Sequence, residues 1–331
     1  MAAPSVNRTA LAFDTSAYTT SIAIVDSEGT VLHDGRRVLE VPAGQRGLRQ
    51  SEALFQHIVN LPGLMAQVEP VLQRRSPAVV AASVAPRNLP ESYMPVFRAG
   101  YTVARSVAAA LGVPFLPLSH QEGHLWAAFL ALREIPEPGE PFLAVHVSGG
   151  TTEALVGRML PEGRLELRIA GETGDLTAGK FVDRIGVALG LPFPAGAELE
   201  RLALDYQGGA LPKVGPAVQG TSVSFSGPLT ALERHMKDFP PEAVAHAAQE
   251  LVADALARWA VNVVREAFSA PPRRAYWVGG VAANTVLRAR ATEQLQALGV
   301  DAVRFAPPSY STDNALGVAY YAATRALQDA G

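Results

Sequence analysis

An internal repeat constrains the fold of this chain more than any other feature of its sequence. The order strand, small polar turn, strand, turn, strand can be read near the N-terminus and again near the middle of the chain. The first copy consists of Thr9–Asp14, Thr15–Thr20, Ser21–Val25, Asp26–Gly29 and Thr30–His33. The second consists of Pro141–Val147, Ser148–Thr152, Glu153–Val156, Pro161–Gly163 and Arg164–Arg168. Two copies of one unit predict a duplicated α/β fold.

A duplicated, hairpin-led α/β unit resembles the two-lobed fold of actin-like ATPases and sugar kinases (the ASKHA fold, a duplicated RNase H-like unit), in which a nucleotide lies between the lobes. Small residues in the turns would let backbone N–H groups approach phosphate, and their hydroxyls would donate further hydrogen bonds. Gly, Ser and Thr are also favoured in ordinary hairpin turns, which is the alternative for either turn alone. Because the two copies match, we predict a first lobe from residues 1–118 and about 305–331, and a second, with inserted helices, from residues 119–304.

Composition and charge fit a globular protein of this size. The chain has 331 residues, of which 48% are hydrophobic and 18% charged, and a net charge of −3. No global attraction therefore draws it to RNA or to an anionic membrane, and RNA would have to be bound by a local patch or a partner. The absence of cysteine excludes disulfides, thiolate metal ligands and a cysteine nucleophile. Because the N-terminal residues lack the apolar core of a signal peptide and no long apolar run follows, we expect a cytoplasmic protein.

One short polar segment after an apolar strand carries a candidate pair of metal ligands. Ser119 and Glu122 have the S-x-x-E spacing of a capping box, which predicts that a helix begins here. His120 and His124 then lie one turn apart on one face, where two imidazoles can bind one metal ion. Such a pair also arises by chance, and Glu122 has a sufficient role as a cap. The spacing differs from the H-E-x-x-H motif of zinc proteases, because Gln121 stands where that motif has its general base.

Later segments offer further places where a ligand could contact the chain. Asp183 follows a glycine-rich turn within an apolar helical pattern, which fits either a ligand contact or a solvated helix face. Ala275–Gly280 reads as a strand that runs into a glycine turn, and Asn284 then opens a helix where it can hydrogen-bond a ribose or a base. Asp313 precedes the last helix, where an acid commonly does no more than stabilise the helix N-terminus.

Taken in order, these segments resemble the TsaD family, the tRNA adenosine threonylcarbamoyltransferases formerly called O-sialoglycoprotein endopeptidases or glycoproteases. The resemblance runs from about residue 9 to the C-terminus and rests on the ordered set of motifs, since each motif alone is weak. The motifs are His-x-Glu-Gly-His at 120–124, Ser-Gly-Gly-x-Thr at 148–152, Gly-Glu-Thr at 171–173, Ala-Gly at 178–179, Asp183, Ser-Phe-Ser-Gly at 224–227, Val-Gly-Gly-Val-Ala-Ala-Asn at 278–284 and Thr-Asp-Asn-Ala at 312–315.

The resemblance implies a reaction and a set of site residues. It implies one metal ion, iron or zinc, held by the catalytic residues His120, His124 and Asp313. It also implies an adenine nucleotide (threonylcarbamoyl-AMP, AMP or ATP) bound by Ser148, Gly149, Gly150, Thr151, Thr152, Asp183, Gly196, Gly279, Gly280 and Asn284. The implied activity is metal-dependent transfer of threonylcarbamoyl from threonylcarbamoyl-AMP to N6 of adenosine 37 in ANN-decoding tRNAs. The implied partners are tRNA and companion threonylcarbamoylation proteins, TsaB-like and TsaE-like.

Several positions depart from the family's usual pattern. Leu176 and Lys180 stand where the family usually has two acids, and Thr151 stands where it has His or Asn. The loss of acids favours, as one alternative, a nucleotide-binding paralogue that serves as a regulatory or partner subunit. The near-neutral charge favours, as another, a carbamoyl or phosphoryl transferase that acts on a small molecule. Metalloprotease activity is disfavoured, because no positioned general base accompanies the histidines.

Overall fold

The structure is a computed structural model that describes residues 8–16, 18–41 and 48–328. The chain forms two compact units, unit 1 from Met1–Ile135 with Thr312–Gly331 and unit 2 from Pro136–Ser311. The sequence prediction instead divides the chain at residue 118 and near residue 305. The difference concerns mainly the helix that begins at His120, which packs against the C-terminal helix of unit 1 through contacts such as that between Trp126 and Tyr320.

Unit 1 is built on a five-stranded sheet with the strand order β3-β2-β1-β4-β5. The first three strands pair antiparallel, and β4 and β5 continue the sheet parallel to β1. The strands are β1 (Thr9–Thr15), β2 (Thr19–Asp26), β3 (Val31–Val38), β4 (Val79–Ala85) and β5 (Phe115–Ser119). The helices are α1 (Gln50–Arg74), α2 (Phe97–Leu111), α3 (His120–Leu132) and α10 (Leu316–Gln328).

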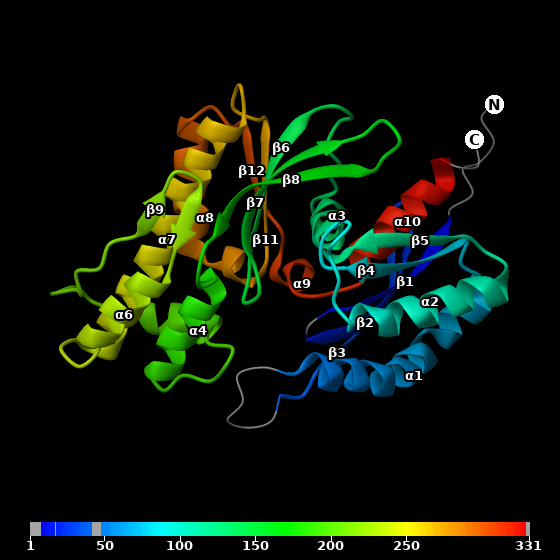
Figure 1. The fold of residues 1–331 in the computed structure, drawn as a ribbon, viewed down its shortest axis with the longest axis horizontal. Coiled ribbons are helices and arrows are strands. Elements are labelled where there is room, and N and C mark those ends of the chain that lie inside the picture. The colour runs from blue at the N-terminus through cyan, green and yellow to red at the C-terminus, as the bar shows by residue number, and fades with distance from the viewer. Residues whose placement is uncertain (1–7, 17, 42–47, 329–331) are drawn as a thin grey trace. The chain divides into compact units, whose positions relative to one another are not determined.

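Helices cover both faces of this sheet, so that its central strands are buried on both sides. Leu11 and Phe13 of β1 belong to one apolar cluster with Leu61 of α1 and Ala104 of α2. Helices α3 and α10 lie on the opposite side of the sheet (Figure 1). Every residue of β1 is buried, as expected for a strand between two helical layers. Because β1, β4 and β5 are parallel neighbours, their carboxyl ends meet at one edge of the sheet, where polar side chains can gather.

Unit 2 repeats this topology and extends it. Its sheet has the order β12-β11-β6-β7-β8-β10-β9, in which β8-β7-β6-β11-β12 matches β3-β2-β1-β4-β5 in order and direction. The predicted duplication is thus confirmed. The strands are β6 (Pro141–Val147), β7 (Thr152–Met159), β8 (Leu165–Thr173), β9 (Ala217–Gln219), β10 (Ser222–Ser224), β11 (Arg274–Val278) and β12 (Ala302–Phe305). The helices are α4 (Ala178–Ala188), α5 (Gly196–Leu204), α6 (Ser226–His235), α7 (Pro241–Ala267), α8 (Thr285–Ala297) and α9 (Pro308–Ser311), with a 3₁₀ turn η1 (Gly280–Ala283).

Helix α7 forms the centre of the apolar core of unit 2. Its residues Leu256, Trp259 and Val263 are fully buried and belong to one cluster with Trp277 of β11 and Phe181 of α4. Long and apolar as α7 is, no helix in the described ranges meets the length and hydropathy that crossing a membrane requires.

The start of α3 follows the predicted capping box. Ser119 Oγ accepts a hydrogen bond from Glu122 N at 3.2 Å, and Glu122 Oε2 accepts one from Ser119 N at 3.0 Å. These reciprocal bonds satisfy N–H groups that a helix start leaves without partners. The helix therefore begins at His120, and its second turn begins with His124.

Candidate metal centre and glycine-rich turns

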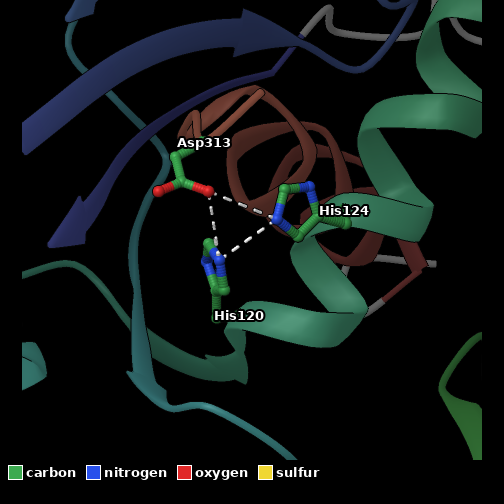
Figure 2. A group of neighbouring side chains, drawn as sticks. All are labelled: His120, His124 and Asp313. Atoms are coloured by element: carbon green, nitrogen blue, oxygen red, sulfur yellow. Dashed lines mark hydrogen bonds and ion pairs between the residues drawn. The ribbon is translucent and has the colours of Figure 1, made fainter. Parts of the chain in front are cut away.

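Three side chains of unit 1 converge at the carboxyl edge of its sheet. His120 and His124 come from the first turns of α3, and Asp313 comes from the segment before α10 (Figure 2). The two Nε2 atoms lie 3.1 Å apart, and Asp313 Oδ1 lies 3.5 Å from that of His120 and 3.6 Å from that of His124. One ligand atom from each residue lies within 4.8 Å of the others. The three residues named from the sequence are thus brought together.

A second layer of polar side chains holds two of these residues. Asp14 Oδ2, at the end of β1, lies 2.9 Å from His120 Nδ1, and it also accepts a hydrogen bond from Ser83 Oγ of β4. Ser16 Oγ donates to Asp313 Oδ2 at 2.6 Å. Sequence reasoning missed Asp14, Ser16 and Ser83. No local sequence pattern marks them, because they meet the histidines only through the parallel pairing of β1, β4 and β5, which brings the carboxyl ends of these strands to one edge of the sheet.

The charges of the cluster shift the titration of its members in different directions. Burial alone would lower the pKa of His120, but the charge and hydrogen bond of Asp14, together with Asp313, raise it to about 10. Burial, followed by the charge of His120, lowers the pKa of His124. Burial alone would raise the pKa of Asp313, but its interactions with the two histidines hold that pKa well below its usual range. Two carboxylates thus favour positive charge at this point.

The donor set fits a divalent metal ion. Asp14 faces Nδ1 of His120, which leaves Nε2 facing His124 and Asp313, the arrangement expected of an imidazole ligand oriented by a carboxylate. Two imidazoles and one carboxylate suit zinc or ferrous iron and leave coordination positions open. The carboxylates of Asp14 and Asp313 would also attract a bound cation. Without a cation, the same two carboxylates favour the protonated form of His120.

The Ser148–Thr152 turn, predicted to bind nucleotide, lies at the carboxyl end of β6 in unit 2. Ser148 Oγ accepts hydrogen bonds from the N–H groups of Gly150 at 3.3 Å and Thr151 at 3.0 Å. Gly149 and Gly150 are exposed, and a Cβ added to either would meet no atom within 4 Å. Open space therefore lies beside the backbone of this turn, as close approach by a phosphate requires.

Helix α4 packs directly on this turn and uses its own first N–H groups there. Ala178 N donates to Thr152 Oγ1 at 2.9 Å, and Gly179 N donates to Ser148 O at 3.2 Å. A Cβ at Gly179 would lie 2.5 Å from Ser148 O, so that only glycine allows this approach. The beginning of α4 thus supports the turn, while the turn itself keeps its exposed face.

Gly279 and Gly280, also predicted to bind nucleotide, follow β11 beside this turn. Strands β6 and β11 are parallel neighbours, with Val278 opposite His146. Gly279 has a φ of +96°, and a Cβ there would lie 2.3 Å from Val147 O. Only glycine permits both the conformation and the contact. The two glycine turns thus lie side by side at one edge of the sheet of unit 2.

The remaining predicted nucleotide contacts have structural partners of their own. Asp183 Oδ1 accepts a hydrogen bond from Ala195 N at 2.9 Å, which fixes the chain just before Gly196 at the start of α5. Burial raises the pKa of Asp183, and the bond from Ala195 opposes that rise. Asn284 Oδ1 caps α8 by accepting from Leu287 N at 3.0 Å. A contact of Asn284 with a ribose or base stays a prediction, since its observed role is that of an N-cap.

We expect the substitution Asn284→Ala to lower the stability of unit 2 by about 1 kcal/mol, because it removes the N-cap of α8. It also removes the donor to Gln249 Oε1, which Asn284 Nδ2 approaches at 3.0 Å. Thermal denaturation would measure the effect. Asn284→Ser is the matched control, because serine retains an oxygen that can cap the helix. Equal melting temperatures for Asn284→Ala and the unmodified protein would contradict the capping role.

Comparison with known proteins agrees with the motifs and the fold. The family model TsaD, tRNA N6-adenosine threonylcarbamoyltransferase, matches residues 91–320. A tRNA N6-adenosine threonylcarbamoyltransferase of Anaeromyxobacter dehalogenans is 34% identical over 96% of this chain and 93% of its own length. Another, from Methanopyrus kandleri, is 33% identical over 90% of this chain and 82% of its own length.

Solved structures show the same fold at low sequence identity. The full-length HypF structure in its phosphate- and nucleotide-bound form superposes with a TM-score of 0.60 at 14% identity, over 97% of this chain and 55% of HypF. A ROK family glucokinase from Streptomyces griseus gives a TM-score of 0.50 at 13% identity, over 96% of this chain and 99% of the kinase. At such identities the likeness concerns the fold alone, that of actin-like ATPases and sugar kinases. By its sequence, the chain belongs to the TsaD family of transferases that modify tRNA.

Proposed function

We propose that this protein transfers the threonylcarbamoyl group of threonylcarbamoyl-AMP to N6 of adenosine 37 in ANN-decoding tRNAs, and that a metal ion held by His120, His124 and Asp313 is required. The observation that carries the proposal is the convergence of two imidazole Nε2 atoms and one carboxylate oxygen in a family of tRNA threonylcarbamoyltransferases. Membership of that family supports the transfer to tRNA, and the convergence of His120, His124 and Asp313 supports the metal requirement.

The proposed reaction is an acyl transfer without a covalent enzyme intermediate. The N6 amine of adenosine attacks the carbamoyl carbonyl carbon, a C–N bond forms, and the bond from that carbon to the phosphate oxygen breaks. AMP leaves with the bond's electron pair, and the attacking nitrogen loses one proton to solvent. A metal ion held by His120, His124 and Asp313 would supply Lewis-acid polarisation to this reaction. No cysteine nucleophile is needed, and the sequence has none.

The protein's own groups have separate tasks in this proposal. In unit 1, His120, His124 and Asp313 would hold the metal ion. In unit 2, the open backbone at Gly149 and Gly150 would hold the phosphate, with the glycine turn at Gly279 beside it. We therefore propose that the adenine nucleotide binds at this edge of the sheet of unit 2 and that Asp183, Gly196 and Asn284 also contact it.

The proposed partners include more than the tRNA substrate. A net charge of −3 gives no general attraction to RNA, so the tRNA would be bound by a local patch or through companion proteins. We propose TsaB-like and TsaE-like proteins as those companions. The transfer assay therefore supplies them together with the chain.

We expect chelation of the metal to reduce formation of modified tRNA by at least about tenfold, and addition of Zn²⁺ or Fe²⁺ to restore it. The measurement follows labelled threonylcarbamoyl from the adenylate into an ANN-decoding tRNA transcript. The same transcript with guanosine at position 37 is the matched control, because it lacks the attacking amine.

The outcomes separate this proposal from its alternatives. Nucleotide binding without product, in an assay where an authentic family member works, would indicate a regulatory or partner subunit. Transfer to a small molecule, by a protein that leaves no footprint on tRNA, would indicate a different transferase. Full activity after verified removal of all metal would contradict the metal requirement alone.

A further inference from the structure

We propose that Asp14 and Ser16, at the carboxyl end of β1, are positioning residues that fix the metal-binding atoms of His120 and Asp313. The inference rests on the proposed metal site and adds two residues whose side chains contact its ligands. Both are buried, with 0% of Asp14 and 1% of Ser16 exposed. They lie two positions apart on the chain, yet one contacts α3 and the other the segment before α10.

Asp14 determines which nitrogen of His120 is free to bind an ion. Its Oδ2 lies 2.9 Å from Nδ1, and an ionised carboxylate can only accept a hydrogen bond. Nδ1 therefore carries the proton, and Nε2 is the atom left for the metal. Ser83 Oγ donates to the same oxygen from the neighbouring strand, which fixes the carboxylate in turn.

Ser16 determines how Asp313 is turned. Its hydroxyl donates to Oδ2 at 2.6 Å, so that Oδ1 is the oxygen that faces the two imidazoles. Ser16 is itself fixed by His57 of α1, whose Nε2 lies 2.8 Å from the Ser16 carbonyl oxygen. A carbonyl only accepts, so His57 Nε2 donates and its Nδ1 accepts from Thr20 Oγ1, 2.8 Å away.

Asp14 also contributes charge to the proposed site. Its Oδ1 is buried and has no hydrogen-bond partner within the described residues. A buried carboxylate that is only partly hydrogen-bonded is costly unless a positive charge lies close by. A divalent ion bound to His120 would supply that charge, whereas Asp313 alone would leave one positive charge of the ion without compensation. One strand end therefore sets both the geometry and the charge of the centre.

The test measures metal affinity rather than activity, on the full chain stripped of metal and titrated with Zn²⁺ against a chromophoric chelator. Asp14→Asn keeps an acceptor oxygen near His120 but removes the charge, and Ser16→Ala removes the donor to Asp313. Ser21→Ala is the matched control, because Ser21 is equally buried in the same hairpin but donates to the backbone oxygen of Asp14. Absorption spectra of the Co²⁺-loaded proteins report the ligand geometry separately from stability.

We expect Asp14→Asn and Ser16→Ala each to weaken Zn²⁺ binding by about 10- to 100-fold and to alter the Co²⁺ spectrum. Ser21→Ala should leave both unchanged. Unaltered affinity and spectra in Asp14→Asn and Ser16→Ala would overturn the positioning role while leaving the metal site intact. An equal loss in Ser21→Ala would also overturn it, because the effect would then arise from general packing. If the unmodified protein bound no Zn²⁺, the proposed metal centre itself would be wrong.

Discussion

Replacing His120 with alanine is expected to reduce tRNA threonylcarbamoylation by more than about a hundredfold. Loss of an outer partner of a metal ligand already costs about 10- to 100-fold in affinity or activity, so loss of a ligand should cost at least as much. The substitution also leaves the buried carboxylate of Asp14 without its ion-pair partner. The measurements are product formation at saturating adenylate and the metal content of the purified variant.

His235→Ala is the matched control for this experiment. His235 lies on α6, its side chain is 48% exposed, and it approaches Asp238 at 3.5 Å on the surface of unit 2. Its removal should leave product formation and metal content unchanged. Wild-type product formation by His120→Ala would remove the metal centre from the mechanism, and normal metal content in an inactive variant would assign His120 another role.

Replacing Gly317 with alanine is expected to destabilise unit 1 by about 3 kcal/mol, because the helices α3 and α10 cross with their backbones in contact. A Cβ at Gly317 would lie 1.9 Å from Gly123 O and 2.3 Å from Ala127 N, both backbone atoms that cannot rotate away. The helices would have to separate, and Asp313 would move with α10 away from His120. We expect a melting temperature lower by about 5–10 °C, together with weaker Zn²⁺ binding.

Gly63→Ala provides the same chemical change in a different setting. Gly63 lies inside α1, and a Cβ there would meet no atom within 4 Å. Alanine loses less conformational entropy than glycine on forming a helix, so this variant should be more stable by about 0.5–1 kcal/mol. Calorimetry of both variants is the check. A Gly317→Ala protein that melts like the unmodified one would show that the helices do not approach as closely as described.

Features set by neighbouring residues could be predicted from the sequence. The capping box at Ser119 predicted the start of α3, and the helical repeat then placed His120 and His124 one turn apart. The repeated order of strands and turns predicted two sheets of matching topology, which the structure confirms. Asn284, read as a possible ribose contact, also precedes a helix, and its local position explains the capping role that it has. Such features follow from backbone geometry over a few residues.

Other features were decided only by the tertiary structure. By its local position Asp313 reads as an ordinary helix-stabilising acid, and only the family resemblance grouped it with the histidines; the packing of α10 on α3 is what brings it to them. Asp14 and Ser16 lie more than a hundred residues from the side chains that they hold. Asp14 meets His120 because β1, β4 and β5 are parallel neighbours and α3 follows β5, and Ser16 meets Asp313 because α10 packs against the same sheet. Separation along the sequence determines which side chains lie one helical turn or one strand apart, whereas strand order and helix crossing decide which distant side chains share a site.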